Sequence, residues 1–446
     1  MKSIWNQTCQ IPRRNPLPGN LDTEVAVIGG GLAGILTAFY LTMEGKQTIV
    51  LEASSIGSGQ TSGTTAKITS QHGLIYQKLL TDRGEASMKL YAKSNQEAVR
   101  DYEQLISSRR ICCGFEKKPA FLYTMNQPNL IHLETLAARK AGIPALEVTE
   151  TSLPLLVKRA VRFPDQASFQ PLKFLEALSS CVTVFERTPV MTVKGHVLST
   201  PRGQVTARKI VFACHYPFPL IPGYFFLRMY QDQSYVLALS GAPDLDGMYL
   251  GIDPDGLSLR SAGPWLLLGG QGHRVGVQKA DPYDALASRA RWLFPHASTE
   301  LQWSAQDCVT IDSLPFIGRF SRNNPDWYVA TGFGKWGMTL SMVSAHILTD
   351  LICGRQSPYE SLYSPSRFRL RPSAPRLAVH MAESAKGLTK GFGPGVMRCP
   401  HMGCRLTWNP AEFTWDCPCH GSRFDRLGRL ITGPAQISCR RHKLIP

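Results

Sequence analysis

Two short cysteine–histidine loops near the C-terminus constrain this chain most strongly. Cys399 and His401 form a CxH motif, and fifteen intervening residues separate it from the CxxH motif of Cys417 and His420. Two cysteines on one iron and two neutral histidines on the other are the ligands of one class of [2Fe-2S] cluster. The same four residue types suit a tetrahedral zinc ion. The spacing therefore predicts a metal centre built from two loops, with zinc as the alternative to iron and sulfur.

The second loop continues as CPCHGS, and both loops together resemble the Rieske [2Fe-2S] domain. The resemblance implies that Cys399 and Cys417 bind one iron of the cluster. His401 and His420 would bind the other iron. A zinc knuckle explains neither the CHGS context nor the additional cysteine in each loop, so the cluster is the favoured interpretation.

The additional cysteines are Cys404 and Cys419, one inside each loop. The Rieske resemblance implies a disulfide between them, which would pin the loops together and leave the four ligands free. By the same resemblance Ser422 would donate a hydrogen bond to the cluster. The Gly433-Pro434 turn would belong to the loop that covers it.

A second pattern lies near the N-terminus, where the short apolar run of residues 24–28 leads into the turn GGGLAG and then a helical pattern. Gly29, Gly31 and Gly34 match the motif GxGxxG, and Glu52 ends the next apolar run eighteen residues after Gly34. Glycines in such a turn let the backbone approach a pyrophosphate at the helix N-terminus, and the acidic residue accepts a ribose hydroxyl. This strand, turn, helix, strand and acid predict a dinucleotide-binding unit.

Two later loops favour FAD over NAD as the dinucleotide. Residues 57–67 are small or carry hydroxyls, which suits a loop lying against phosphates and a flat ring. Residues 331–338 form a second glycine-rich loop, between a strand-like run and a helix expected to begin near Thr339. Two such loops, far apart in sequence, suit a cofactor that threads through a domain built from both ends of the chain. Taken singly, each loop could also be an ordinary turn.

With these motifs, residues 24–353 resemble the flavoprotein group of D-amino-acid oxidase, glycine oxidase and sarcosine oxidase. The chain resembles more narrowly the subgroup that carries a C-terminal Rieske segment. The resemblance implies that the ADP half of FAD is held by Gly29, Gly31, Gly34 and Glu52. It places near the flavin ring Thr64, Thr65, Ala66, Lys67, Gly332, Gly334, Lys335, Gly337 and Met338.

The expected fold is α/β (α+β). It combines a Rossmann-type FAD-binding domain, an inserted mixed-sheet substrate domain and a small β-rich C-terminal Rieske module. The expected bounds are 1–363 for the oxidoreductase (FAD-binding parts about 21–80, 205–217 and 305–355; substrate domain about 120–301), 364–386 for a linker rich in Pro, Ser and Arg, and 387–446 for a shortened Rieske domain. So short a module has little core of its own, so its cluster loops are expected to pack on the flavoprotein body.

The sequence offers no convincing catalytic base. By the resemblance, His273 and Asp312 come close to the flavin face, and Lys335 is a further candidate in the second glycine-rich loop. His273 could equally be a hydrogen-bonded structural histidine, and Asp312 could cap a turn. Because hydride removal is the chemistry of the flavin, a missing acid–base motif does not argue against catalysis.

Charge and apolar patterning bear on partners and location. The net charge is +16, and the 81 residues from Ser366 onward hold 14 Lys and Arg against 4 Asp and Glu, a surplus of +10. This surplus would suit an acidic electron-transfer protein or be a solvated basic linker. No nucleic-acid-binding motif accompanies it.

Without an export signal or an apolar run long enough for a transmembrane segment, the expected location is cytoplasmic. The other eight cysteines are expected only to pack: Cys9, Cys112, Cys113, Cys181, Cys214, Cys308, Cys353 and Cys439.

These features predict a flavin-dependent oxidoreductase acting on a small-molecule substrate with a CH-NH or CH-OH donor. Its electrons would pass singly through the cluster to an acceptor, with His401 and His420 on the side where an external partner docks. Two alternatives are a ferredoxin-fed reductase running in the opposite direction and a redox sensor without turnover.

Overall fold

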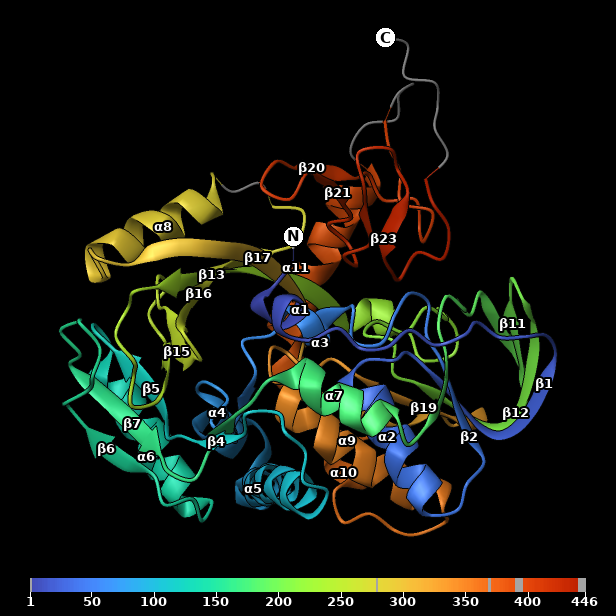
Figure 1. The fold of residues 1–446 in the computed structure, drawn as a ribbon, viewed down its shortest axis with the longest axis horizontal. Helices are drawn as coiled ribbons and strands as arrows, with labels where there is room; N and C mark the ends of the chain where they lie inside the picture. The colour runs from blue at the N-terminus through green and yellow to red at the C-terminus, as the bar shows by residue number, and fades with distance from the viewer. Residues whose placement is uncertain (1, 278–279, 368–369, 390–395, 440–446) are drawn as a thin grey trace.

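The computed structural model describes residues 2–277, 280–367, 370–389 and 396–439. Within them, two eight-stranded sheets and their helices form the body of the molecule, and a four-stranded sheet forms the C-terminal module. In Figure 1 this module lies at the top, over strands β13 and β17 of the body.

The first sheet is built around β1 (Leu21–Ile28), which pairs in parallel with β2 (Thr48–Leu51) and β12 (Gly203–Phe212). The apolar end of β1 is buried, as expected for a central parallel strand covered on both faces. The sheet also contains β9 (Thr183–Phe185), β10 (Thr192–Lys194), β11 (Val197–Thr200), β18 (Phe316–Ser321) and β19 (Asn324–Thr331). Helices α2 (Leu32–Met43) and α9 (Gly337–Ile352) pack on each other and on this sheet.

The second sheet is mixed and pairs β13 (Met229–Ser240) with β17 (Ser298–Thr310) and β16 (Trp265–Arg274). It continues through β15 (Ser258–Ala262), β14 (Met248–Gly251), β5 (Ala120–Thr124), β7 (Arg159–Phe163) and β6 (Leu146–Val148).

Strand pairing bears on the expected domain bounds. The FAD-binding part expected at about 205–217 begins in β12 of the first sheet. Strands β9, β10 and β11, which fall within the expected substrate range of 120–301, also belong to that sheet. Position 305 falls inside β17, which stays in the second sheet as far as Thr310. Gly269 to His273 form the end of β16.

Helix α5 (Glu85–Ser108) turns one buried face to the core. The remaining elements of the body are α1 (Ile4–Thr8), α3 (Gln60–Gly63), α4 (Ile75–Arg83), α6 (Pro128–Lys140), α7 (Pro171–Ser179), α8 (Pro282–Leu293), α10 (Glu360–Tyr363), the 3-10 turn η1 (Phe225–Leu227), and the short strands β3 (Lys67–Ile68), β4 (Glu116–Lys117) and β8 (Ala167–Ser168). Over the described parts of the chain, every helix is too short or too polar to cross a membrane.

The C-terminal module contains β20 (Thr407–Asn409), β21 (Thr414–Asp416), β22 (Arg423–Phe424) and β23 (Leu430–Thr432). The segment 364–386, which its composition marked as a linker, is largely helical, because α11 spans Leu370–Thr389. Its second half, RLAVHMAESAK, consists mostly of good helix formers, which outweigh the prolines of the first turns.

Candidate functional site

A cavity of about 1230 Å³ is lined by residues from both large sheets and from the C-terminal module. Eleven of the thirteen residues expected near FAD line it: Gly29, Gly31, Glu52, Thr64, Thr65, Lys67, Gly332, Gly334, Lys335, Gly337 and Met338. The other two, Gly34 and Ala66, do not line it. The two glycine-rich loops therefore meet at one cavity, although the sequence separates them widely.

Two glycines of the GxGxxG turn are required because backbone atoms approach them closely. A Cβ on Gly34 would overlap the carbonyl oxygen of Gly29, so a side chain there would push α2 away from the turn. Gly29 has φ +110°, and a Cβ on it would lie 2.6 Å from the carbonyl oxygen of Ala213. The third glycine of GxGxxG thus allows close packing of helix and strand, and leaves the turn open to a pyrophosphate.

Glu52 holds the same turn from the next strand. Its Oε2 accepts a hydrogen bond from the backbone N–H of Gly30 at 2.7 Å, and its Oε1 accepts one from Ser54 at 2.7 Å. Burial raises the pKa of this carboxyl, although these backbone hydrogen bonds oppose the shift. An acid at this edge of the cavity can accept the hydroxyls of a ribose.

Besides Glu52, three charged side chains line the cavity. Lys67 donates hydrogen bonds from Nζ to the Tyr249 carbonyl and to Ser258 Oγ, both at 2.7 Å, and burial lowers its pKa to about 7. Lys335 has a left-handed backbone with φ +78° in the second glycine-rich loop. Asp307, on β17, is the third.

Asp307 is a residue that the sequence analysis missed. Burial raises the pKa of its carboxyl to about 6, and the charge of Lys335 partly opposes that shift. A titration in the range of catalytic groups, at a cavity wall, marks it as a functional candidate. A single aspartate in a polar strand gave no signal in the sequence.

The structure separates the other two catalytic candidates from the cavity. His273 lies in a small pocket beside β20, where its ring nitrogens are 3.1 Å from the Tyr235 hydroxyl and 2.9 Å from the Arg274 carbonyl oxygen. Asp312 is held in a buried ion-pair network by Arg83 and Arg367. Of the three expected candidates, Lys335 alone lines the cavity.

The cysteine–histidine loops form a second buried site. The thiols of Cys399 and Cys417 are buried, and a hydrogen bond from the Cys417 thiol lowers the pKa of Cys399. Both ring nitrogens of His401 and Nδ1 of His420 are buried without a hydrogen-bond partner among the described residues. Since buried polar atoms are normally satisfied, these orphan nitrogens fit a metal-binding role.

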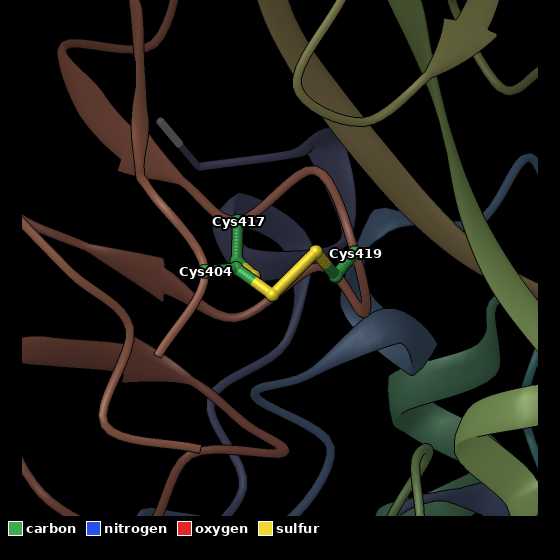
Figure 2. Close-up of side chains that lie close together, drawn as sticks. All are labelled: Cys404, Cys417 and Cys419. Atoms are coloured by element: carbon green, nitrogen blue, oxygen red, sulfur yellow. A yellow bond between two sulfur atoms is a disulfide. The ribbon is translucent and has the colours of Figure 1, made fainter. Parts of the chain in front are cut away.

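A disulfide joins Cys404 and Cys419, and Cys417 lies beside it (Figure 2). Ser422 Oγ accepts a hydrogen bond from the backbone N–H of Ala435 at 3.0 Å, which ties the Gly433-Pro434 turn to the second loop.

His420 faces the body of the molecule, contrary to the expectation that both histidines lie on an outer side. Its Nε2 is 3.1 Å from the carbonyl oxygen of Phe226, and its ring lies near those of Tyr216 and His380. His401 is the more exposed of the two. The reason is the route of the second loop, which lies against β13 and β17 and turns its histidine inward.

Two other cysteines do more than pack. Cys214 and Cys308 line the cavity, and Cys308 Sγ lies 3.4 Å from Nε2 of His215. Cys112 and Cys181 are exposed rather than packed.

Comparison with known proteins identifies both parts of the chain. Residues 24–351 match the family model described as FAD dependent oxidoreductase. The chain belongs to this family. Residues 395–443 of the oxidoreductase match the Rieske [2Fe-2S] domain. Its cofactors are therefore FAD and a Rieske [2Fe-2S] cluster, and zinc is no longer needed to explain the second site.

One relative aligns with both parts of the chain. The oxidoreductase is 34% identical to the putative Rieske 2Fe-2S iron-sulfur protein YhfW of Bacillus subtilis (strain 168), over 97% of this chain and 96% of the relative. A segment of the oxidoreductase is also 39% identical over 60 residues to the cytochrome b6-f complex iron-sulfur subunit of Nostoc punctiforme. This alignment covers 14% of the oxidoreductase and 33% of that protein.

Solved structures show the fold of the body. The glycine oxidase of Geobacillus kaustophilus superposes with a TM-score of 0.66 at 20% identity, over 78% of the oxidoreductase and 100% of that chain. The L-proline dehydrogenase of P. horikoshii superposes with a TM-score of 0.64 at 19% identity, over 79% of the oxidoreductase and 98% of that chain.

Proposed function

We propose that this oxidoreductase oxidises an amine, amino acid or related small donor at FAD and passes the electrons singly through the Rieske cluster to an acceptor. In this proposal the ADP half of FAD lies against Gly29, Gly31, Gly34 and Glu52. The flavin ring lies beside Thr64–Lys67 and Gly332–Met338.

The cluster ligands in this proposal are Cys399 and Cys417 on one iron and His401 and His420 on the other. The buried thiols and the orphan ring nitrogens described above support this set. The disulfide joins the two loops without using a ligand.

One observation carries the proposal: the two cofactor sites share a wall. Residues 430–436 of the C-terminal module line the same cavity as the two glycine-rich loops. A module that only reported redox state to a partner would not need to close the cavity of the flavin. A one-electron centre placed there can receive electrons directly from the flavin.

The chemistry at carbon is that of the bound flavin, which takes a hydride from a carbon next to nitrogen or oxygen, while the protein positions and desolvates the donor. The donor loses two electrons and two protons, and two one-electron oxidations of the reduced flavin return it to its starting state. Asp307, Lys335 and Lys67 are the charged groups available to bind the donor or to hold its proton.

The names of the structural relatives favour a CH-NH donor over a CH-OH donor. Glycine oxidase, L-proline dehydrogenase and the L-amino acid deaminase of Proteus vulgaris all carry amino acids in their names. An acidic electron-transfer protein is the proposed acceptor, because the basic surplus of the C-terminal part would steer it to the cluster.

Anaerobic mixing of the purified protein with a panel of amines and amino acids tests the proposal. The expected result is loss of the flavin absorption band, followed by the electron paramagnetic resonance signal of a reduced Rieske cluster. Cluster reduction by a reduced ferredoxin, followed by flavin reduction, would instead support the reductase direction. Absence of turnover with every donor and with artificial one-electron acceptors would support the sensor.

A further inference from the structure

Two buried glutamines connect the body to the cluster loop. Gln231 on β13 donates from Nε2 to the carbonyl oxygen of His420 at 2.7 Å. Gln306 on β17 donates from Nε2 to the carbonyl oxygen of Gly421 at 2.6 Å. The two glutamine residues are only 2% and 1% exposed. We infer that Gln231 and Gln306 are positioning residues that hold the cluster loop at a fixed distance from the FAD cavity for electron transfer.

The inference rests on the proposed function, since it concerns the same transfer between flavin and cluster. Each step moves one electron from the reduced flavin to the oxidised cluster, and the proton leaves to solvent. The one-electron acceptor then reoxidises the cluster. The two glutamines take no part in this chemistry and act only through the position of His420.

The shape of the loop matches the glutamines closely. Gly421 has φ +78°, and a Cβ on it would overlap Gln306 Nε2 and lie 2.6 Å from Gln231 Cδ. On the other side of the loop, Pro418 packs so closely on Gly276 that a Cβ there would overlap its ring. A larger residue at Gly421 or Gly276 would therefore lift the loop from the body.

A hydrogen-bonded connection continues from Gln231 to the cavity wall. The Nε2 atom of His215 is 3.3 Å from Gln231 Oε1 and 3.4 Å from Cys308 Sγ. Both His215 and Cys308 line the cavity. Gln231 therefore contacts both sites. Its amide nitrogen donates a hydrogen bond to the main chain of His420, a proposed cluster ligand, and its amide oxygen contacts His215 in the cavity wall.

Glutamine suits this position for a physical reason. The carbonyl groups of His420 and Gly421 are buried against β13 and β17, and a buried carbonyl without a hydrogen-bond donor is energetically unfavourable. An apolar side chain could fill the space but could not satisfy these carbonyls, so the loop would shift toward water. Because electron transfer slows as the distance between centres grows, such a shift would slow reduction of the cluster.

The variants Gln231→Met and Gln306→Met keep the side-chain length and remove the donor. Gln302→Met, on the same strand β17 but away from the cluster loop, is the matched control. Each protein is prepared with both cofactors, and the flavin is reduced by light with EDTA, which makes the test independent of the natural donor. Flavin absorption and the electron paramagnetic resonance signal of the cluster are followed in time.

We expect flavin photoreduction to be unchanged and cluster reduction to slow several-fold in both glutamine variants, and further in the double variant. Reduction of the cluster by dithionite should keep its rate. Hydrogen exchange of residues 417–422 should increase in these variants, whereas Gln302→Met should match the wild type in every measurement.

Variants that hold both cofactors, transfer electrons at the wild-type rate and show unchanged exchange at 417–422 would overturn the inference. If the methionine variants do not fold, Gln231→Asn and Gln306→Asn shorten the reach of the amide and give the same comparison. A wild-type protein whose reduced flavin never reduces its cluster would instead refute the proposed function itself.

Discussion

Replacing Asp312 should destabilise the protein and leave the chemistry at the flavin intact. Its Oδ2 pairs with Arg83 at 2.7 Å and with Arg367 Nε at 2.8 Å, and its Oδ1 accepts from Arg367 at 3.1 Å. The side chains of all three residues are less than 10% exposed. One carboxylate therefore pairs with two buried guanidinium groups.

Removing one member of a buried ion pair costs about 3–5 kcal/mol, because an uncompensated charge stays buried. We expect Asp312→Ala to lower the free energy of unfolding of the protein by about 3–5 kcal/mol. Asp312→Asn should lose less, since its amide oxygen still accepts one hydrogen bond. Arg367 keeps its hydrogen bonds to the carbonyls of Pro315 and Tyr363 in both variants.

The same pair predicts a pH dependence of stability. Burial raises the pKa of Asp312, but the charges of Arg367 and Arg83 outweigh burial, and the net shift is downward. A carboxyl whose folded pKa lies below its unfolded value of about 3.9 contributes stability above that pH and loses it as the pH falls through the folded pKa. The difference in free energy of unfolding between Asp312→Ala and the wild type should therefore be largest at neutral pH and should shrink as the pH falls into the acid range.

Thermal unfolding followed by circular dichroism, at equal FAD content, measures the effect. The control is Asp350→Ala, which removes a half-exposed pair with Arg355 and should cost at most about 1 kcal/mol. A catalytic role for Asp312 would give the opposite pattern: Asp312→Asn would keep the melting temperature of the wild type and lose flavin reduction by a donor.

Three further predictions concern the two cofactor sites. Gly34→Ala should abolish FAD binding, read as the ratio of flavin to protein absorbance, while Gly19→Ala, with no atom near its added Cβ, should bind FAD normally. Asp307→Asn should remove an inflection near pH 6 from the rate of flavin reduction; a wild-type rate that is flat from pH 5 to 8 would contradict this role. Isolated residues 387–446 should not form a stable cluster-bearing domain, because the contacts of the loop with Gln231 and Gln306 are lost; a folded red fragment would refute this.

The local patterns predicted local structure well. Helix α2 begins directly after Gly31 and ends at Met43 before Gly45, and β1 and β2 flank it as the dinucleotide pattern requires. These elements follow from hydrophobic periodicity and from glycines whose roles depend on the nearest neighbours. The Rieske motif was equally readable, because its cysteines and histidines lie within two short loops.

The roles of single polar residues were not predictable in this way. His273 and Asp312 both have side chains that could act as acids or bases. In the structure, His273 lies in a pocket beside β20, and Asp312 forms ion pairs with Arg83 and Arg367, which are 229 and 55 positions away in the sequence. Asp307 lines the cavity only because β17 pairs with β13. Each outcome depends on contacts between distant segments, which no local pattern encodes.

The dinucleotide turn and the Rieske cluster motif could both be identified from the amino-acid sequence, because each depends on closely spaced residues. How the two sites are joined became clear only from the packing of distant segments. It places β13 and β17 under the cluster loop, turns His420 toward the body and lets residues 430–436 close the FAD cavity. The physical reason is that a module with a small core satisfies its buried carbonyls and covers its apolar surface on the flavoprotein body.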